Sequence, residues 1–317
     1  KERIISKNFK NISFEYHYFG FDKTYQLYLE KIYKALSTVK TPYVILADDD
    51  DFFIPSGIEE SLIFLDNNED FSICGGRHGG IFNETFSIYL EGEYTLKDSP
   101  YSIEGINNPD CLDRVSEHLK NYASNYYDVH RTEQLTRCFK EVAELNLSDL
   151  YLVEIYCQVS SLINGKSKKL NTSYLVRQHN NPTSSARYSS GGGSIGRMLE
   201  PNWSKDFTSS MRVLAEKINK KNTNLEFQDL YDKVCSLYKG FLLIQLRKEF
   251  QSNKRILSKI FSGLNFKSLR LLCSLIFVNT FSLKVKNSKL TFFSNMHHST
   301  GYKDIVLFLN SYKERDV

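Results

Sequence analysis

The stretch Tyr43-Val44-Ile45-Leu46-Ala47-Asp48-Asp49-Asp50-Asp51 decides the fold expected of this chain. Its first five residues form a short, unbroken apolar run, which is typical of a strand buried in a helix-covered sheet. Four aspartates follow at the carboxyl end of that strand, where open α/β sheets bind their ligands. The stretch therefore predicts an α/β fold with a polar site at the end of one strand.

Strands and helices alternate on both sides of this stretch. The patterns predict strands at 11–18, 43–47, 71–74 and 170–176, and helices at 22–37, 57–66, 133–145 and 148–163. Ser148 is expected to cap the last of these helices. Residues 79–130 show no sustained periodicity, so we expect short strands and substrate-facing loops there. The alternation is typical of an α/β domain.

A change of composition near residue 183 divides the chain. We expect a catalytic domain at 1–182, a Ser/Gly-rich connection or lid at 183–200, and an α-helical domain at 201–317 with helices near 211–218, 227–250 and 256–274. Residues 1–200 carry a net charge of −7, and residues 201–317 carry +11. The basic helices either pack their apolar faces on the catalytic domain or lie on an anionic membrane surface.

The composition excludes several classes of protein. With 317 residues, 41% hydrophobic and 25% charged, the chain has enough apolar residues to fold. No apolar run is long enough to cross a bilayer, and residues 1–7 lack the core of a secretion signal. We therefore expect a cytoplasmic protein, with peripheral attachment to the inner face of the membrane as the alternative. The basic residues match no nucleic-acid recognition motif, so nucleic acid is not an expected partner.

The four adjacent aspartates point to a cation site. Neighbouring carboxylates repel one another, and a hard divalent cation such as Mg²⁺ or Mn²⁺ neutralises them through oxygen ligands. A solvated acidic turn is the alternative interpretation. The position directly after a buried strand favours the cation site.

The residues after the aspartates extend the pattern, because Phe52-Phe53-Ile54-Pro55 adds an aromatic pair and a proline. The whole run resembles that of the GT-A glycosyltransferases, in particular the inverting family 2-type enzymes that build bacterial surface polysaccharides such as capsule and lipopolysaccharide. The resemblance covers roughly residues 11–180 and implies a GT-A-like, Rossmann-type mixed sheet flanked by helices. It implies that Asp48 contacts the nucleotide sugar, that Asp50 and Asp48 bind Mn²⁺ or Mg²⁺, and that Asp49 and Asp51 are further donor contacts.

The resemblance also implies a catalytic base on a later helix. Ser148-Asp149 opens that helix, and a turn at Gly165-Lys166 and a strand ending in His179 follow it. By this likeness Asp149 is the expected general base and Glu154 the reserve candidate. The alternative for Asp149 is an acid in the first turn that stabilises the helix dipole.

Three further residues are weaker candidates. Arg77, within the glycine-rich run 74–80, would pair a phosphate or the acceptor, although a plain glycine-rich turn is the simpler interpretation. His179 is either a third metal or diphosphate contact or an ordinary hydrogen-bonded histidine. Arg187 and the Ser/Gly run 189–194 form either a lid over the donor or a passive linker.

The sequence thus predicts an enzyme that moves a sugar from a nucleotide-sugar donor to a surface glycan or lipid-linked acceptor. The chain opens with what is expected to be the end of a helix, so the family's first strand is expected to be missing. Two alternatives stay open. The first is a metal-dependent phospho- or nucleotidyltransferase, since aspartates at strand ends also hold Mg²⁺ on phosphates. The second is an inactive GT-A-like module that scaffolds other enzymes.

Overall fold

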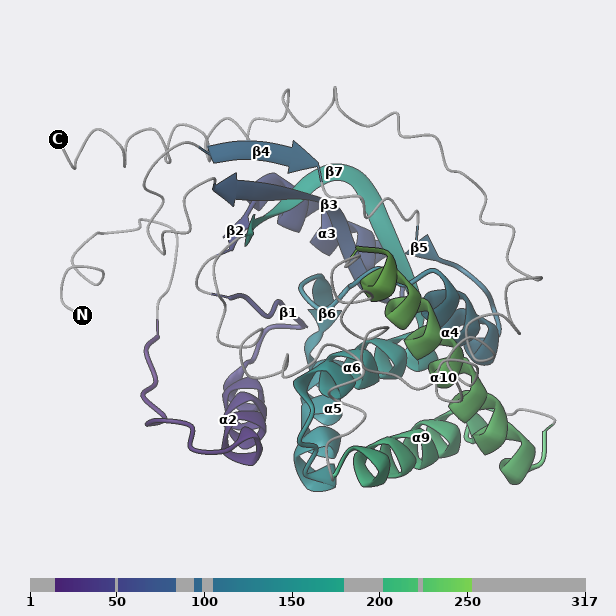
Figure 1. The fold of residues 1–317 in the computed structure, drawn as a ribbon. Helices are drawn as coiled ribbons and strands as arrows, with labels where there is room; N and C mark the ends of the chain where they lie inside the picture. Colours follow the sequence, from purple (N-terminus) through teal and green to yellow (C-terminus); the bar gives the residue numbers. More distant parts are fainter. Residues whose placement is uncertain are drawn as a thin grey trace, which may run out of the picture.

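A computed structural model describes residues 15–48, 51–83, 94–98, 105–179, 202–221 and 225–252. These residues form seven helices and a seven-stranded sheet (Figure 1). The helices are α2 (Tyr25–Thr38), α3 (Pro55–Asn67), α4 (Cys111–Lys120), α5 (Thr132–Leu145), α6 (Leu150–Asn164), α9 (Trp203–Asn219) and α10 (Phe227–Ser252). The strands are β1 (Tyr43–Val44), β2 (Phe52–Phe53), β3 (Phe71–Asn83), β4 (Tyr94–Asp98), β5 (Gly105–Ile106), β6 (Val129–Arg131) and β7 (Lys166–His179). The predicted α/β class is confirmed.

The sheet is mixed, and two long strands form its centre. The strand order is β1-β6-β3-β7-β2, with β4 added to β3 and β5 added to β7. Strands β3 and β7 run parallel, whereas every other pair of strands is antiparallel. Figure 1 shows β3 and β7 curving together into an arch, with α3 packed on the arch and α4, α5, α6, α9 and α10 gathered below it.

Glycines in β3 let the central strands lie close to their neighbours. A Cβ atom on Gly75 would lie 2.1 Å from Oδ1 of Asp128, and one on Gly76 would lie 2.5 Å from the carbonyl oxygen of Thr172. Both distances are far below van der Waals contact, so any larger residue would push these groups apart. The glycine-rich run 74–80 is therefore part of a strand, and the interpretation of it as a turn was wrong.

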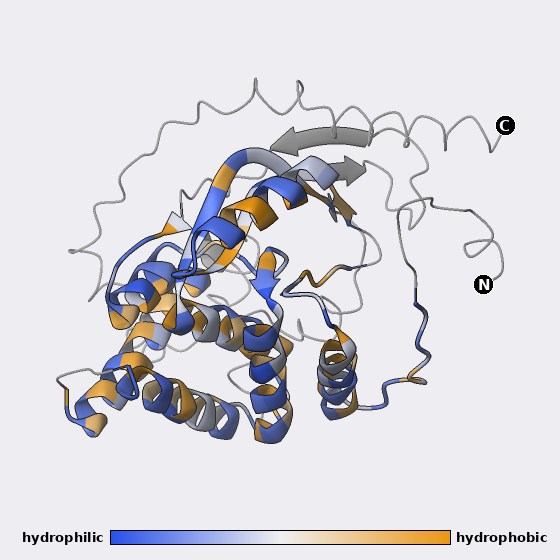
Figure 2. Ribbon diagram, turned by 180° about the vertical axis from the view of Figure 1, so that it is seen from behind, coloured by the Kyte–Doolittle hydropathy of each residue, from blue (hydrophilic) through white to orange (hydrophobic). Residues whose placement is uncertain are grey.

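Two groups of apolar side chains stabilise the fold. The larger group joins α2, α4, α5 and α6 to α9 and α10, and includes Phe139, Tyr156 and Phe241. The smaller group joins α3 to the sheet through residues such as Leu65 and Tyr174. Figure 2 shows both hydrophobic and hydrophilic residues along these helices, as expected for helices that pack one face on a core.

Helices α9 and α10 belong to the larger core. Met211 and Leu214 of α9 and Phe241 of α10 are buried in it. Asp206 of α9 is also buried, and its Oδ2 accepts hydrogen bonds from Ser148 N at 2.8 Å and from Ser148 Oγ at 2.6 Å. Helices α9 and α10 therefore pack their apolar faces on the preceding domain, which was the first of the two arrangements considered for the basic helices. The helix expected at 256–274 lies outside the described residues.

Several local predictions need correction. The strand expected at 11–18 does not form over its described residues 15–18, which have no regular structure. Helix α4 occupies part of the segment 79–130, where we expected loops and short strands. Its residues are polar on average although one face of the helix is buried, so the sequence pattern did not indicate a helix. The strands expected at 71–74 and 170–176 are longer, because each pairs with the other along the arch.

Within the described residues, no helix is both long and apolar enough to cross a membrane.

Candidate functional site

Asp48 and Asp51 are brought to a common arginine by strand pairing. Asp48 follows β1, and Asp51 directly precedes β2. Strand β2 pairs with β7 in a register that sets Phe52 opposite Val176, so the next residue of β7, Arg177, lies beside the aspartates. Arg177 Nε donates to Asp51 Oδ2 at 3.0 Å, and its Nη2 lies 3.7 Å from Asp48 Oδ2. The Asp51 side chain is 1% exposed, whereas that of Asp48 is 48% exposed.

Tyr127 completes this group of side chains. Its hydroxyl donates to Asp48 Oδ2 at 2.5 Å, and the Arg177 guanidinium carbon lies 4.5 Å from the centre of its ring, a cation–π contact. Burial, together with the negative charge of Asp48, raises the pKa of Tyr127, so its hydroxyl stays protonated and donates. Burial opposes the charge on Arg177, but Tyr127, Asp51 and Asp48 outweigh it and raise the pKa of the guanidinium.

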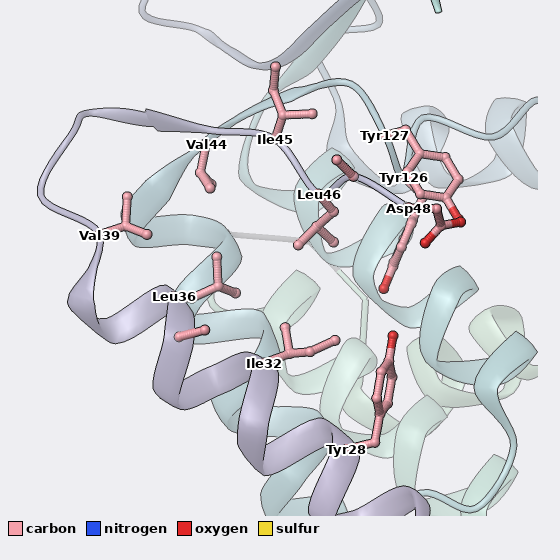
Figure 3. Close-up of a pocket in the computed structure, with 12 residues that line it drawn as sticks. Tyr28, Ile32, Leu36, Val39, Val44, Ile45, Leu46, Asp48, Tyr126 and Tyr127 are labelled. Atoms are coloured by element: carbon pink, nitrogen blue, oxygen red, sulfur yellow. The ribbon is translucent and has the colours of Figure 1, made fainter. Parts of the chain in front are cut away.

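An apolar cavity of about 320 Å³ opens beside Asp48. Helix α2 forms one wall, the extended chain from Val44 to Asp48 forms another, and Tyr126 and Tyr127 close the third. In Figure 3 the side chains of Tyr28 and Tyr126 point toward each other, while Asp48 lies beside Tyr127. Burial, followed by the charge of Asp48, raises the pKa of Tyr28 to about 12. The cavity therefore offers aromatic walls with a carboxylate at one end.

The loop between α4 and β6 connects this cavity to Glu154 of α6. Oε1 of Glu154 accepts three hydrogen bonds, from Tyr122 Oη at 2.9 Å, Ser124 Oγ at 3.0 Å and Gln158 Nε2 at 3.0 Å. The same loop carries Tyr127, whose pKa Glu154 helps to raise. Glu154 is thus held at one oxygen by neutral donors, two of which come from the loop that carries Tyr127. Its Oε2 accepts no hydrogen bond from the described residues.

Asp149 has a different environment, because it is the N-cap of α6. Its Oδ1 accepts from the backbone nitrogens of Tyr151 at 2.8 Å and Leu152 at 3.4 Å. Ser148, which was expected to be the cap, instead bonds to Asp206 of α9. An N-cap carboxylate stabilises the helix start by satisfying free backbone donors and by its favourable position in the helix dipole.

A buried ionic group supports the loop from behind. Lys169 Nζ of β7 lies 2.6 Å from both carboxylate oxygens of Asp128, and His78 Nε2 of β3 lies 3.6 Å from Oδ1. Burial opposes ionisation of Asp128, but Lys169 and His78 hold the pKa of this carboxyl below its usual range. Tyr174, stacked on His78, donates its hydroxyl to the Tyr127 carbonyl at 2.9 Å. The group therefore fixes the backbone at Tyr127.

The remaining predicted site residues are only partly described. Asp49, Asp50 and Arg187 lie outside the described residues, and of His179 only the backbone, at the end of β7, is described. Arg77 is half-buried in the middle of β3, opposite Ser173 of β7. No group of three or more His, Cys, Asp or Glu side chains within the described part of the chain is placed to hold a metal ion.

Sequence reasoning missed Arg177 and the tyrosines around Asp48. Arg177 was passed over in favour of His179, two residues later in the same strand. The need for a cation beside Asp51 follows from the deep burial of its carboxylate, which only the structure shows. Tyr126 and Tyr127 belong to the run Tyr122-Ala-Ser-Asn-Tyr-Tyr-Asp128, whose aromatic and polar residues show no helical or strand period.

Comparison with known proteins adds no family assignment. No protein-family model matches the chain. A search of curated proteins gives no significant match.

Proposed function

We propose that this chain is a metal-dependent glycosyltransferase with a GT-A-type fold, which moves a sugar from a nucleotide-sugar donor to a glycan or lipid-linked acceptor. The observation that carries the proposal is the half-exposed carboxylate of Asp48 at the end of a cavity with aromatic walls. Binding sites for cofactors and small molecules are typically apolar cavities of this size with a few polar groups at fixed positions. The resemblance of residues 43–55 to GT-A enzymes supports the same conclusion.

The donor side of the site combines apolar walls with charge. The cavity beside Tyr28 and Tyr126 suits a flat nucleoside, and Asp48 at its end lies where a diphosphate would follow. Carboxylate oxygens suit Mg²⁺ or Mn²⁺, so Asp48 fits such an ion, with Asp50 as the predicted second ligand. When bound, the cation stabilises the negative charge that develops on the departing diphosphate.

Of the two candidates for the general base, the hydrogen bonds favour Glu154. Its Oε1 is held by three donors, which fixes the orientation of the carboxylate and leaves Oε2 without a hydrogen bond from the described residues. A base held in this way can take the proton of an acceptor hydroxyl as the new glycosidic bond forms. Attack opposite the departing diphosphate then inverts the anomeric carbon. Asp149 uses Oδ1 to cap α6, a role that explains its position without any catalysis.

The acceptor and the cellular site are proposed from charge alone. The excess of Lys and Arg after residue 201 suits an acceptor carried on an anionic membrane surface, with the enzyme bound peripherally at the cytoplasmic face. In the described residues, α9 and α10 place apolar faces in the core instead. Any membrane contact would therefore use their polar faces or the chain beyond residue 252.

Incubation with a panel of nucleotide sugars labelled in the sugar tests the proposal. With Mn²⁺ present, the expected result is release of nucleoside diphosphate and transfer of label to an acceptor or to water. The variant Asp48→Asn should lose this activity, and Lys205→Ala, an exposed site on α9, should retain it. Transfer of a phosphoryl or nucleotidyl group instead would support the phospho- or nucleotidyltransferase alternative. Absence of any turnover, with glycan synthesis in cells unaffected by Asp48→Asn, would support the scaffold.

A further inference from the structure

The guanidinium of Arg177 has more hydrogen-bonding capacity than the described residues use. Its Nε donates to Asp51, but neither Nη1 nor Nη2 makes a hydrogen bond to any described residue, and the Asp48 carboxylate is 3.7 Å away. Four N–H donors of a permanently charged group are therefore directed elsewhere. The side chain is 34% exposed and lies beside Asp48, which lines the cavity.

The surroundings of Arg177 hold it in one place. Asp51, whose side chain is 1% exposed, binds Nε, and the guanidinium carbon lies over the Tyr127 ring. Strand β7 fixes the backbone by pairing with β2 on one side and β3 on the other. A planar, charged group that is already oriented binds a phosphate through two parallel hydrogen bonds at a low cost in entropy.

We propose that Arg177 is a diphosphate ligand of the donor site, bound to the phosphate oxygens through its Nη1 and Nη2 atoms. The inference rests on the proposed function, since it assigns a residue to the same nucleotide-sugar site. With a cation held at Asp48, the guanidinium of Arg177 would supply a second positive charge to the diphosphate. Asp51 serves as the carboxylate that orients Arg177, and Tyr127 links Arg177 to Asp48.

Calorimetric titration of the full chain with inorganic pyrophosphate, in excess Mg²⁺, tests this assignment. Arg177→Lys keeps the positive charge but removes the planar fork of donors, so the pyrophosphate affinity should fall about tenfold or more, as expected for the loss of a charged hydrogen bond. The matched control is Arg137→Lys, an exposed arginine of α5 that is paired with Glu133. The control should bind pyrophosphate as the wild-type chain does.

A second variant guards against misfolding of the first. Asp51→Asn with Arg177→Gln keeps a hydrogen-bonded pair without a buried charge, and it should show the same loss of affinity. Equal pyrophosphate affinity in Arg177→Lys and wild type, or no binding by wild type, overturns the assignment. If sugar transfer occurs but the pyrophosphate affinity is the same with and without Arg177, only this inference fails. If binding depends on Arg177 but no donor is turned over, the inference stands and the proposed function fails.

Discussion

Exchanging Glu154 for glutamine should remove turnover while leaving the protein folded. A glutamine carbonyl can still accept hydrogen bonds from Tyr122, Ser124 and Gln158, so the packing around α6 is retained. The amide bonds are weaker than those to a carboxylate, and we expect a loss of about 1 kcal/mol in unfolding free energy. An amide cannot take a proton, however, and general-base catalysis contributes roughly 100- to 10,000-fold to the rate.

Asp149→Asn is the matched control for Glu154→Gln. Asparagine is as good an N-cap as aspartate, so its carbonyl should keep the bonds to the start of α6. We expect unchanged stability and turnover within about twofold of wild type, since capping energies of Asn and Asp are similar. Sugar transfer under saturating donor, with urea denaturation of each variant, measures both effects. Near-normal turnover in Glu154→Gln with collapse in Asp149→Asn would refute this reasoning and return the base role to Asp149.

The remaining predictions concern stability. Gly75→Ala would displace the buried Asp128 carboxylate from Lys169 and should lower the unfolding free energy by about 3 to 5 kcal/mol. Gly240 in α10 has open space around it, so Gly240→Ala should raise the unfolding free energy by about 0.5 to 1 kcal/mol. Equal melting temperatures of the two variants would contradict this. Burial lowers the pKa of His118 to about 4. As the pH falls below 6.5, the imidazole therefore binds a proton in the unfolded chain but stays neutral in the native chain until about pH 4. Stability should therefore fall by about 3 kcal/mol between pH 6.5 and 4, and a pH series of urea melts should show a shallower fall in His118→Gln. Asp206→Ala leaves the backbone N–H and the hydroxyl of Ser148 without their acceptor and should lower the unfolding free energy by about 1.5 to 3 kcal/mol in the same melts. An unchanged unfolding free energy would show that these two hydrogen bonds do not stabilise the fold.

Local patterns predicted the elements whose residues share a period. Helices α3, α5 and α6 lie within a few residues of the predicted ranges, because their apolar positions repeat with helical spacing. The pattern at 43–47 located β1, but only its first two residues pair in the described sheet. Helix α4 escaped prediction because its buried face includes Arg114 and His118, which a hydropathy pattern counts as polar.

Contacts between segments that are distant in the chain could not be predicted from the sequence. The aspartate run made Asp48 a candidate site residue, but nothing local indicates that Arg177 lies beside it. That contact depends on the register of β2 with β7. The role of the glycine run was likewise hidden, because the groups that exclude a Cβ come from distant segments: Asp128 from the loop before β6, and Thr172 from β7. Spacing alone also could not separate Glu154 from Asp149. Our proposal of Glu154 as the base rests on their different hydrogen-bond partners, which only the structure shows.

The most direct measurement of the central claim is donor binding at Asp48. Calorimetric titration with nucleoside diphosphates, with and without Mn²⁺, should show binding that Mn²⁺ strengthens in the wild-type chain and no such increase in Asp48→Asn. The neutral amide is close in size to the carboxylate it replaces, so the fold should persist, and denaturation checks it. Mn²⁺-stimulated binding that is unchanged in Asp48→Asn would contradict the claim that this carboxylate forms the donor site.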